Sequence, residues 1–185
     1  MTKFGILNFI FFFVGCSQAP KVDLTQFLGF HIGKPISEQY LDATSNEYPT
    51  RILKLETSNI EAAKNFDNLT IQIIESDTSI YSITAKKKFK ISALCNNAFQ
   101  KLYQLYNAQY AHLKQSKKIQ VGDKVINSDD GYKSFDGSKH LQLFGCSVND
   151  KGIYQLELSL WDSERQKKSD MLWSKFTANK LIKRD

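Results

Sequence analysis

Two pairs of short apolar-rich runs constrain the fold of this chain more than any other feature of its sequence. They are residues 69–75 with 80–85, and residues 141–148 with 153–160. Residues 76–79 and 149–152, which separate the members of each pair, are rich in turn-forming Ser, Asp, Asn and Gly. In the last run, apolar residues alternate with polar ones from Tyr154 to Leu160, so we expect one side of this strand to face water. The pattern predicts an antiparallel sheet built from hairpins.

A pattern with helical spacing separates these two pairs of runs. It begins at Ser92 and extends to about Leu113, with apolar side chains three and four residues apart. These side chains include Leu94, Ala98, Leu102, Leu105 and Tyr106. Shorter helical patterns cover residues 37–43, where Ser37 is a suitable cap, and residues 169–181. We therefore predict an α+β fold, in which an antiparallel sheet packs against one long central helix, with short N- and C-terminal helices.

The first sixteen residues have the pattern of an export signal. Lys3 precedes an apolar run of twelve residues, 4–15. A helix that spans a membrane needs about 20 residues, so this run has the length of the hydrophobic segment of a signal peptide instead. Phe13-Val14-Gly15-Cys16 resembles the lipobox of bacterial lipoprotein signal peptides, in which a small residue precedes the cysteine that receives the lipid. The resemblance implies that Cys16 is lipidated and that its acyl chains anchor the protein to a membrane.

The same resemblance implies a division of the chain into a signal peptide, a tether and a domain. Residues 1–15 are the expected signal peptide, 16–26 a lipidated tether, and 27–185 a single α+β periplasmic domain. Ser17 implies the outer membrane, by the sorting rule of enterobacterial lipoproteins. We therefore expect a lipid-anchored protein of the cell envelope. An ordinary signal peptide cut after Ala19, or a short uncleaved anchor, remains an alternative.

Cys95 and Cys146 are the two cysteines that remain when Cys16 is assigned to the anchor. Export places them in an oxidising compartment, where a pair of cysteines normally forms a disulfide. A bridge closing a loop of about 50 residues contributes on the order of 4 kcal/mol in the chain-entropy description. The alternative is a reactive Cys95 at a helix N-terminus, with His140 on a later strand. That order resembles exported papain-like peptidoglycan hydrolases, although Leu94-Cys95-Asn96-Asn97 lacks the Asp-Cys-Ser-Gly of that family.

The remaining motifs do not indicate a metal, a cofactor or nucleic acid. His31, His112 and His140 lack the paired spacing of a zinc site, and residues 127–131 lack the Gly and Glu positions of a calcium loop. We therefore expect no cofactor and no metal. The net charge is +6, with a lysine-rich run at 86–90. In an exported chain, this charge favours a solvated surface, anionic head groups or an acidic partner over nucleic acid.

The overall layout resembles small periplasmic lipoproteins of unassigned role. The matching features are the entry segment Leu28-Gly29-Phe30, the short helix expected from Ser37 to Leu41, Cys95 on the main helix, and Leu143-Phe144-Gly145-Cys146 on a late strand. We expect a non-catalytic, lipid-anchored envelope protein that acts as a periplasmic protein-binding or structural module, with an envelope partner that the sequence does not identify. A Cys–His peptidoglycan hydrolase-like enzyme and an inhibitor or immunity lipoprotein are the alternatives.

Overall fold

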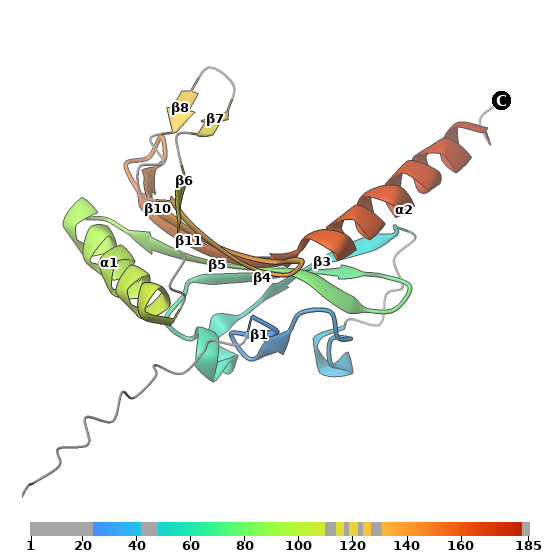
Figure 1. Cartoon of the computed structure of the whole chain (residues 1–185), viewed down its shortest axis with the longest axis horizontal. Coiled ribbons are helices and arrows are strands. Elements are labelled where there is room, and N and C mark those ends of the chain that lie inside the picture. Colours follow the sequence, from blue (N-terminus) through green and yellow to red (C-terminus); the bar gives the residue numbers. More distant parts are fainter. Residues whose placement is uncertain are drawn as a thin grey trace, which may run out of the picture.

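The computed structural model of the chain shows a curved antiparallel sheet with a helix on one face and a second helix that extends away from it (Figure 1). The structure describes residues 24–41, 48–109, 114–116, 119–121, 124–126 and 131–182. The main sheet has seven strands in the order β3 (Thr50–Leu55), β4 (Asn68–Ile74), β5 (Ser79–Phe89), β11 (Tyr154–Asp162), β10 (Lys139–Val148), β9 (Gly131–Asp136) and β6 (Lys114–Ser116).

Two small two-stranded sheets and several helices complete the described residues. The small sheets pair β1 (Gln26–Phe27) with β2 (Phe30–His31), and β7 (Ile119–Val121) with β8 (Lys124–Ile126). The α-helices are α1 (Ser92–Gln109) and α2 (Ser163–Ile182). The short 3-10 helices are Glu38–Tyr40, Thr57–Asn59 and Glu61–Ala63.

The pairing of β5 with β11 joins the two halves of the main sheet. Ala85 lies opposite Leu158 and Ile83 opposite Leu160, and all four side chains are fully buried. Complete burial of a large aliphatic side chain contributes about 1.5–3 kcal/mol. This contact therefore supplies a strong driving force for bringing together strands that are far apart in the sequence.

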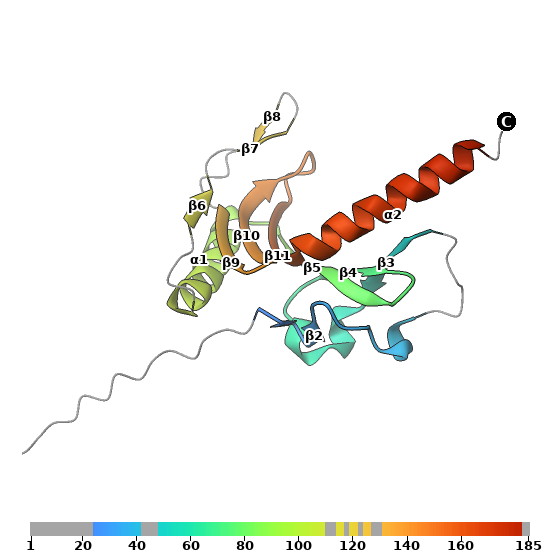
Figure 2. The same cartoon turned by 45° about the vertical axis from the view of Figure 1, so that its right-hand side comes forward.

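The core lies between one face of the sheet, α1 and the N-terminal segment. Cys95 and Phe99 of α1 belong to the same buried cluster as Phe27, Phe30 and Ile32 of the N-terminal segment. Figure 2 shows α2 leaving the end of β11 and extending away from the sheet. Its first turns contact the sheet, while its C-terminal end lies away from it. The apolar interior therefore forms without the distal half of α2.

The hairpins predicted from the sequence are confirmed. β4 pairs with β5, and β10 pairs with β11, both in antiparallel register. Asn149 organises the second turn, because its side-chain oxygen accepts hydrogen bonds from the N–H groups of Lys151 and Ile153, each at 3.0 Å. The turn residues and the alternation of apolar and polar side chains therefore predict these two hairpins.

The predicted overall architecture, one long central helix against a sheet with short terminal helices, is wrong. The seven-stranded antiparallel sheet dominates, and the longest described helix is the C-terminal α2 with 20 residues. α2 begins at Ser163 and not at Ser169, because the Asp162 carboxylate accepts hydrogen bonds from the N–H groups of Glu164 and Arg165 and caps the helix there. β11 therefore passes directly into α2 without a loop.

The prediction of a short helix over residues 37–43 is also wrong for the part of this range that the structure describes. Only Glu38–Tyr40 is helical, as a single 3-10 turn. The Ser37 side chain makes no capping hydrogen bond, and Leu41 already has extended backbone angles. Residues 42–47 lie outside the described part of the chain. Without a cap, this three-residue segment has no stable helical nucleus to extend.

We predict that Leu158→Ala lowers the free energy of unfolding by about 2–5 kcal/mol, because it creates a cavity in the central strand pair. Ile52→Ala on β3 is the matched control, since Ile52 is 58% exposed. Its expected cost is less than about 1 kcal/mol. Denaturant unfolding of both variants measures the difference, and equal costs for the two substitutions would contradict the placement of the core.

Candidate functional site

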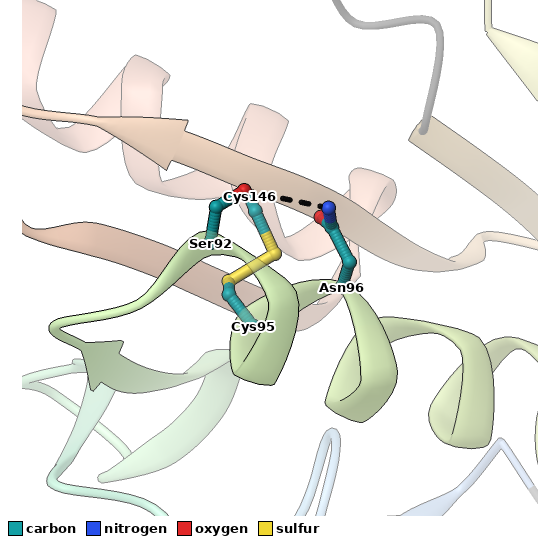
Figure 3. Close-up of a disulfide and its surroundings, with 4 residues drawn as sticks. All are labelled: Ser92, Cys95, Asn96 and Cys146. Carbon is teal, nitrogen blue, oxygen red and sulfur yellow. Dashed lines mark hydrogen bonds between the residues drawn. A yellow bond between two sulfur atoms is a disulfide. The ribbon is translucent and has the colours of Figure 1, made fainter.

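Cys95 and Cys146 form a disulfide that joins the first turn of α1 to β10 (Figure 3). Their Cα atoms are 5.9 Å apart, and the two residues are 51 positions apart in the sequence. The Cys95 side chain is completely buried, and nearby Asn96 donates a 3.4 Å hydrogen bond to the Ser92 hydroxyl. The bridge therefore fixes the start of α1 to the sheet.

The structure does not bring Cys95 and His140 together. His140 precedes Cys146 by six positions on β10, which corresponds to about 20 Å along a strand. The His140 ring stacks on Trp161, with 5.2 Å between the ring centroids. The Sγ atom of Cys95 is bonded to Cys146, so no free thiolate stands at the start of α1 in this form of the protein. A Cys–His nucleophile pair therefore has no basis in this geometry.

Other residues singled out from the sequence lie apart or outside the described residues. His31 is exposed at the end of β2. Cys16, His112 and residues 127–130 lie outside the part of the chain that the structure describes. The lipid anchor thus stays a prediction from the sequence.

A cavity of about 370 Å³ lies where the start of α2 meets the N-terminal segment and β10. Its described lining carries the cationic side chains Lys34, Lys139 and Arg165, the imidazole of His31 and the carboxylate of Asp162. These groups come from three segments that are distant in the sequence. The arrangement gathers an excess of positive charge around one concave surface.

Two backbone hydrogen bonds hold the N-terminal part of this cavity against β5. The N–H of Gly33 donates to the Ile80 carbonyl at 2.8 Å, and the N–H of Ile80 donates to the Lys34 carbonyl at 2.9 Å. Gly33 has a φ of +82°, which a residue with a side chain rarely adopts. A Cβ atom on this residue would also come within 3.0 Å of the Arg165 Nε atom. Glycine therefore allows the backbone to approach the Arg165 guanidinium closely.

A network of polar side chains fixes the first two turns of α2 to the turn between β4 and β5. The Nη1 of Arg165 donates to the Ser79 hydroxyl at 3.0 Å, and its Nε lies 3.8 Å from a carboxylate oxygen of Asp162. Both the N–H and the hydroxyl of Ser79 donate to Oδ1 of Asp77. The Lys168 ammonium donates to Oδ2 of Asp77 at 2.8 Å. The network sets the position of Arg165 at the cavity.

The Asp77 carboxyl has a lowered pKa as a result of these contacts. Partial burial acts to raise the pKa, but hydrogen bonds from Lys168 and Ser79 and the charge of Lys168 outweigh it and lower the value from 3.8 to about 2. The folded state therefore favours the ionised carboxylate. This contribution to stability is present above pH 3.8 and is lost as the pH falls through the folded value of about 2.

The middle of α2 contacts the sheet edge through aromatic side chains. The indole N–H of Trp173 donates to the Thr50 hydroxyl at 2.8 Å, and its ring stacks on Tyr48 with 5.6 Å between centroids. Phe176 packs edge-on against Trp173, and the Lys180 ammonium lies 4.7 Å from the centre of the Phe176 ring. These contacts hold one side of α2 and explain why the helix leaves the sheet in a fixed direction.

The opposite side of α2 carries large apolar side chains that face solvent. Met171 is 59% exposed and Ile182 is 72% exposed, and Leu181 is similarly open. Lys167 and Lys175, both exposed, accompany them on the helix. Exposed apolar side chains grouped on one element, with charged side chains around them, are typical of surfaces that bind other proteins.

The cavity was missed by reasoning from the sequence, because no local motif connects its residues. Lys34 and Lys139 are more than a hundred positions apart, and only the sheet register places them near Arg165. One local signal was available. Asp162 directly precedes Ser163 and Glu164, and an Asp with an acidic residue two positions later is typical of a helix start.

Comparisons with known proteins give no assignment. No protein family, no curated protein and no solved structure matches the chain. Within the described residues, no group of three or more His, Cys, Asp and Glu side chains is arranged to hold a metal ion. The helices that the structure describes include none that is both long enough and apolar enough to cross a membrane.

We predict that the Cys95–Cys146 bridge forms in the oxidised protein and stabilises it. In a Cys16→Ser chain unfolded without reductant, thiol reagents should label no cysteine, and two should react after reduction. The Cys95→Ala/Cys146→Ala double variant should lose about 2–4 kcal/mol of unfolding free energy. Two reactive thiols in the oxidised chain, or an unchanged unfolding free energy in the double variant, would count against the bridge.

We predict that Asp77→Asn weakens the pH dependence of stability between pH 4 and pH 2, because the carboxylate that titrates with a lowered pKa is removed. The Asp77 side chain is 43% exposed, so solvent screening limits the loss at neutral pH to about 1 kcal/mol or less. Urea unfolding across this pH range measures the effect, with exposed Glu38→Gln as the control. If Asp77→Asn and the parent lose stability in parallel as the pH falls, the network does not lower this pKa.

Proposed function

We propose that this chain is a non-catalytic, lipid-anchored cell-envelope protein whose domain binds another envelope protein. The lipobox-like Phe13-Val14-Gly15-Cys16 supports the anchor, and the Cys95–Cys146 disulfide supports an oxidising compartment. The exposed side of α2 carries the binding part of the proposal. This side of the helix exposes apolar side chains, and the contacts on the opposite side fix the orientation of α2 on the sheet.

The charge of α2 indicates the character of the partner. The helix contains more basic than acidic residues: Arg165, Lys167, Lys168, Lys175 and Lys180 against Glu164 and Asp170. Lys168 is engaged by Asp77, but Lys167 and Lys175 have exposed side chains near Met171. An acidic partner surface with an apolar centre matches this arrangement, because opposite charges steer the encounter and apolar contact supplies affinity.

The anchor is tested by mass spectrometry of the membrane-bound protein. We expect the first residue to be Cys16 carrying acyl chains, because the lipobox directs lipidation before cleavage. Cys16→Ser should abolish lipidation without changing the fold of the domain. Recovery of a chain that begins at Met1 from the membrane fraction would contradict the proposed processing.

The binding surface is tested by photo-cross-linking in intact cells. A photoreactive residue at Met171 or Ile182 should give a discrete cross-linked species, because these side chains are exposed on α2. The same residue at exposed Ser58, far from α2 in the sequence, is the control position. Lys167→Glu/Lys175→Glu should remove the species from the α2 positions. Equal cross-linking from all three positions, or no effect of charge reversal, would contradict docking through α2.

A further inference from the structure

The cavity at the start of α2 has an excess of positive charge that its own residues do not neutralise. Asp162 is the carboxylate in the described lining, and it is already engaged. It accepts hydrogen bonds from the N–H groups of Glu164 and Arg165 at 3.0 and 3.3 Å, and it lies 3.8 Å from the Arg165 guanidinium. Its single negative charge stands against three basic residues in the described lining, Lys34, Lys139 and Arg165.

Lys34 and Lys139 contribute the charge that is left over. Among the residues that the structure describes, neither ammonium group has an ion pair or a side-chain hydrogen bond. Lys139 begins β10 opposite Asp162, and Lys34 follows the turn at Gly33. The two lysines therefore approach the same space from different elements.

The N-terminus of α2 adds to the positive potential of the cavity, but its backbone N–H groups are already hydrogen-bonded within the protein. A helix of this length carries about half a positive charge at its N-terminus. The N–H of Ser163 donates to the Ser138 carbonyl at 2.7 Å, and the next two N–H groups bind Asp162. An anion in the cavity would therefore be held by side chains, while the helix terminus only strengthens the field.

We infer that this cavity binds an anionic group, a phosphate or a carboxylate, through Lys34, Lys139 and the Arg165 guanidinium. Arg165 is held in place by Ser79 and Asp162, so little side-chain order must be gained on binding. The imidazole of His31 lines the same cavity and offers a further hydrogen-bonding group. A volume of about 370 Å³ exceeds that of a single phosphate, so the cavity has room for part of the molecule that carries it.

Two sources present this chemistry in a cell envelope. A soluble metabolite or peptide offers a free phosphate or carboxylate, and an anionic phospholipid offers a phosphodiester head group. The site is separate from the outward side of α2, so it does not rest on the proposed protein partner. Both sources are distinguished by the choice of probe.

The test uses the full chain as Cys16→Ser in detergent, with inorganic phosphate and glutarate as soluble probes. NMR amide shifts of residues 31–34, 139 and 162–165 should move together during either titration. In Lys34→Gln/Lys139→Gln, the apparent Kd should rise about tenfold, because charge-assisted hydrogen bonds are lost. Lys54→Gln/Lys101→Gln is the control, since it removes the same net charge from exposed positions elsewhere. It should change the Kd by less than about twofold.

Vesicles of phosphatidylglycerol, compared with phosphatidylcholine, test the lipid source. A lipid head group is the ligand if Lys34→Gln/Lys139→Gln weakens binding to the anionic vesicles and the control does not. A soluble ligand is indicated if the same pattern is seen with soluble phosphate. Equal weakening in both variants would show diffuse surface charge and overturn the inference. Failure of phosphate, glutarate and anionic vesicles to bind the parent chain would overturn it as well. Unchanged circular dichroism spectra and unfolding midpoints check that both variants fold.

Discussion

The rest of the structure depends on the antiparallel pairing of β5 with β11. In this pair, Ala85 lies opposite Leu158 and Ile83 lies opposite Leu160. The burial of these side chains joins two hairpins that come from separate parts of the chain. The same register places the end of β11 beside the beginning of β5. Asp162 therefore lies where it can cap α2 and contact Arg165, which reaches Ser79. The cavity is thus a consequence of how the central strands are aligned.

The two sides of helix α2 have different environments. Three hydrogen bonds along the helix hold its inner side: Arg165 donates to Ser79, Lys168 to Asp77 and Trp173 to Thr50. These contacts consist mainly of polar and aromatic interactions, since the apolar core lies on the other side of the sheet with α1. The outer side is left to solvent. A helix that is fixed but not buried presents its exposed side chains at low conformational cost to a partner.

The sequence predicts the parts of the fold that local chemistry decides. Alternation and turn residues predict the β4–β5 and β10–β11 hairpins, and Ser92 correctly marks the beginning of α1. The predicted start of the last helix at residue 169 is wrong, because α2 begins at Ser163 and Ser169 is buried within it. The β5–β11 pairing and the cavity could not be predicted, since each joins residues from distant segments and no single window of sequence contains the signal.

Native-state hydrogen exchange tests the central role of the β5–β11 pairing most directly. If this pairing joins the whole sheet, the amides of both strands should exchange slowest in the protein. Their opening free energies should equal each other and the global unfolding free energy. The distal turns of α2 should exchange much faster, because they extend from the sheet. Different opening free energies for β5 and β11, with the two hairpins opening independently, would contradict the account.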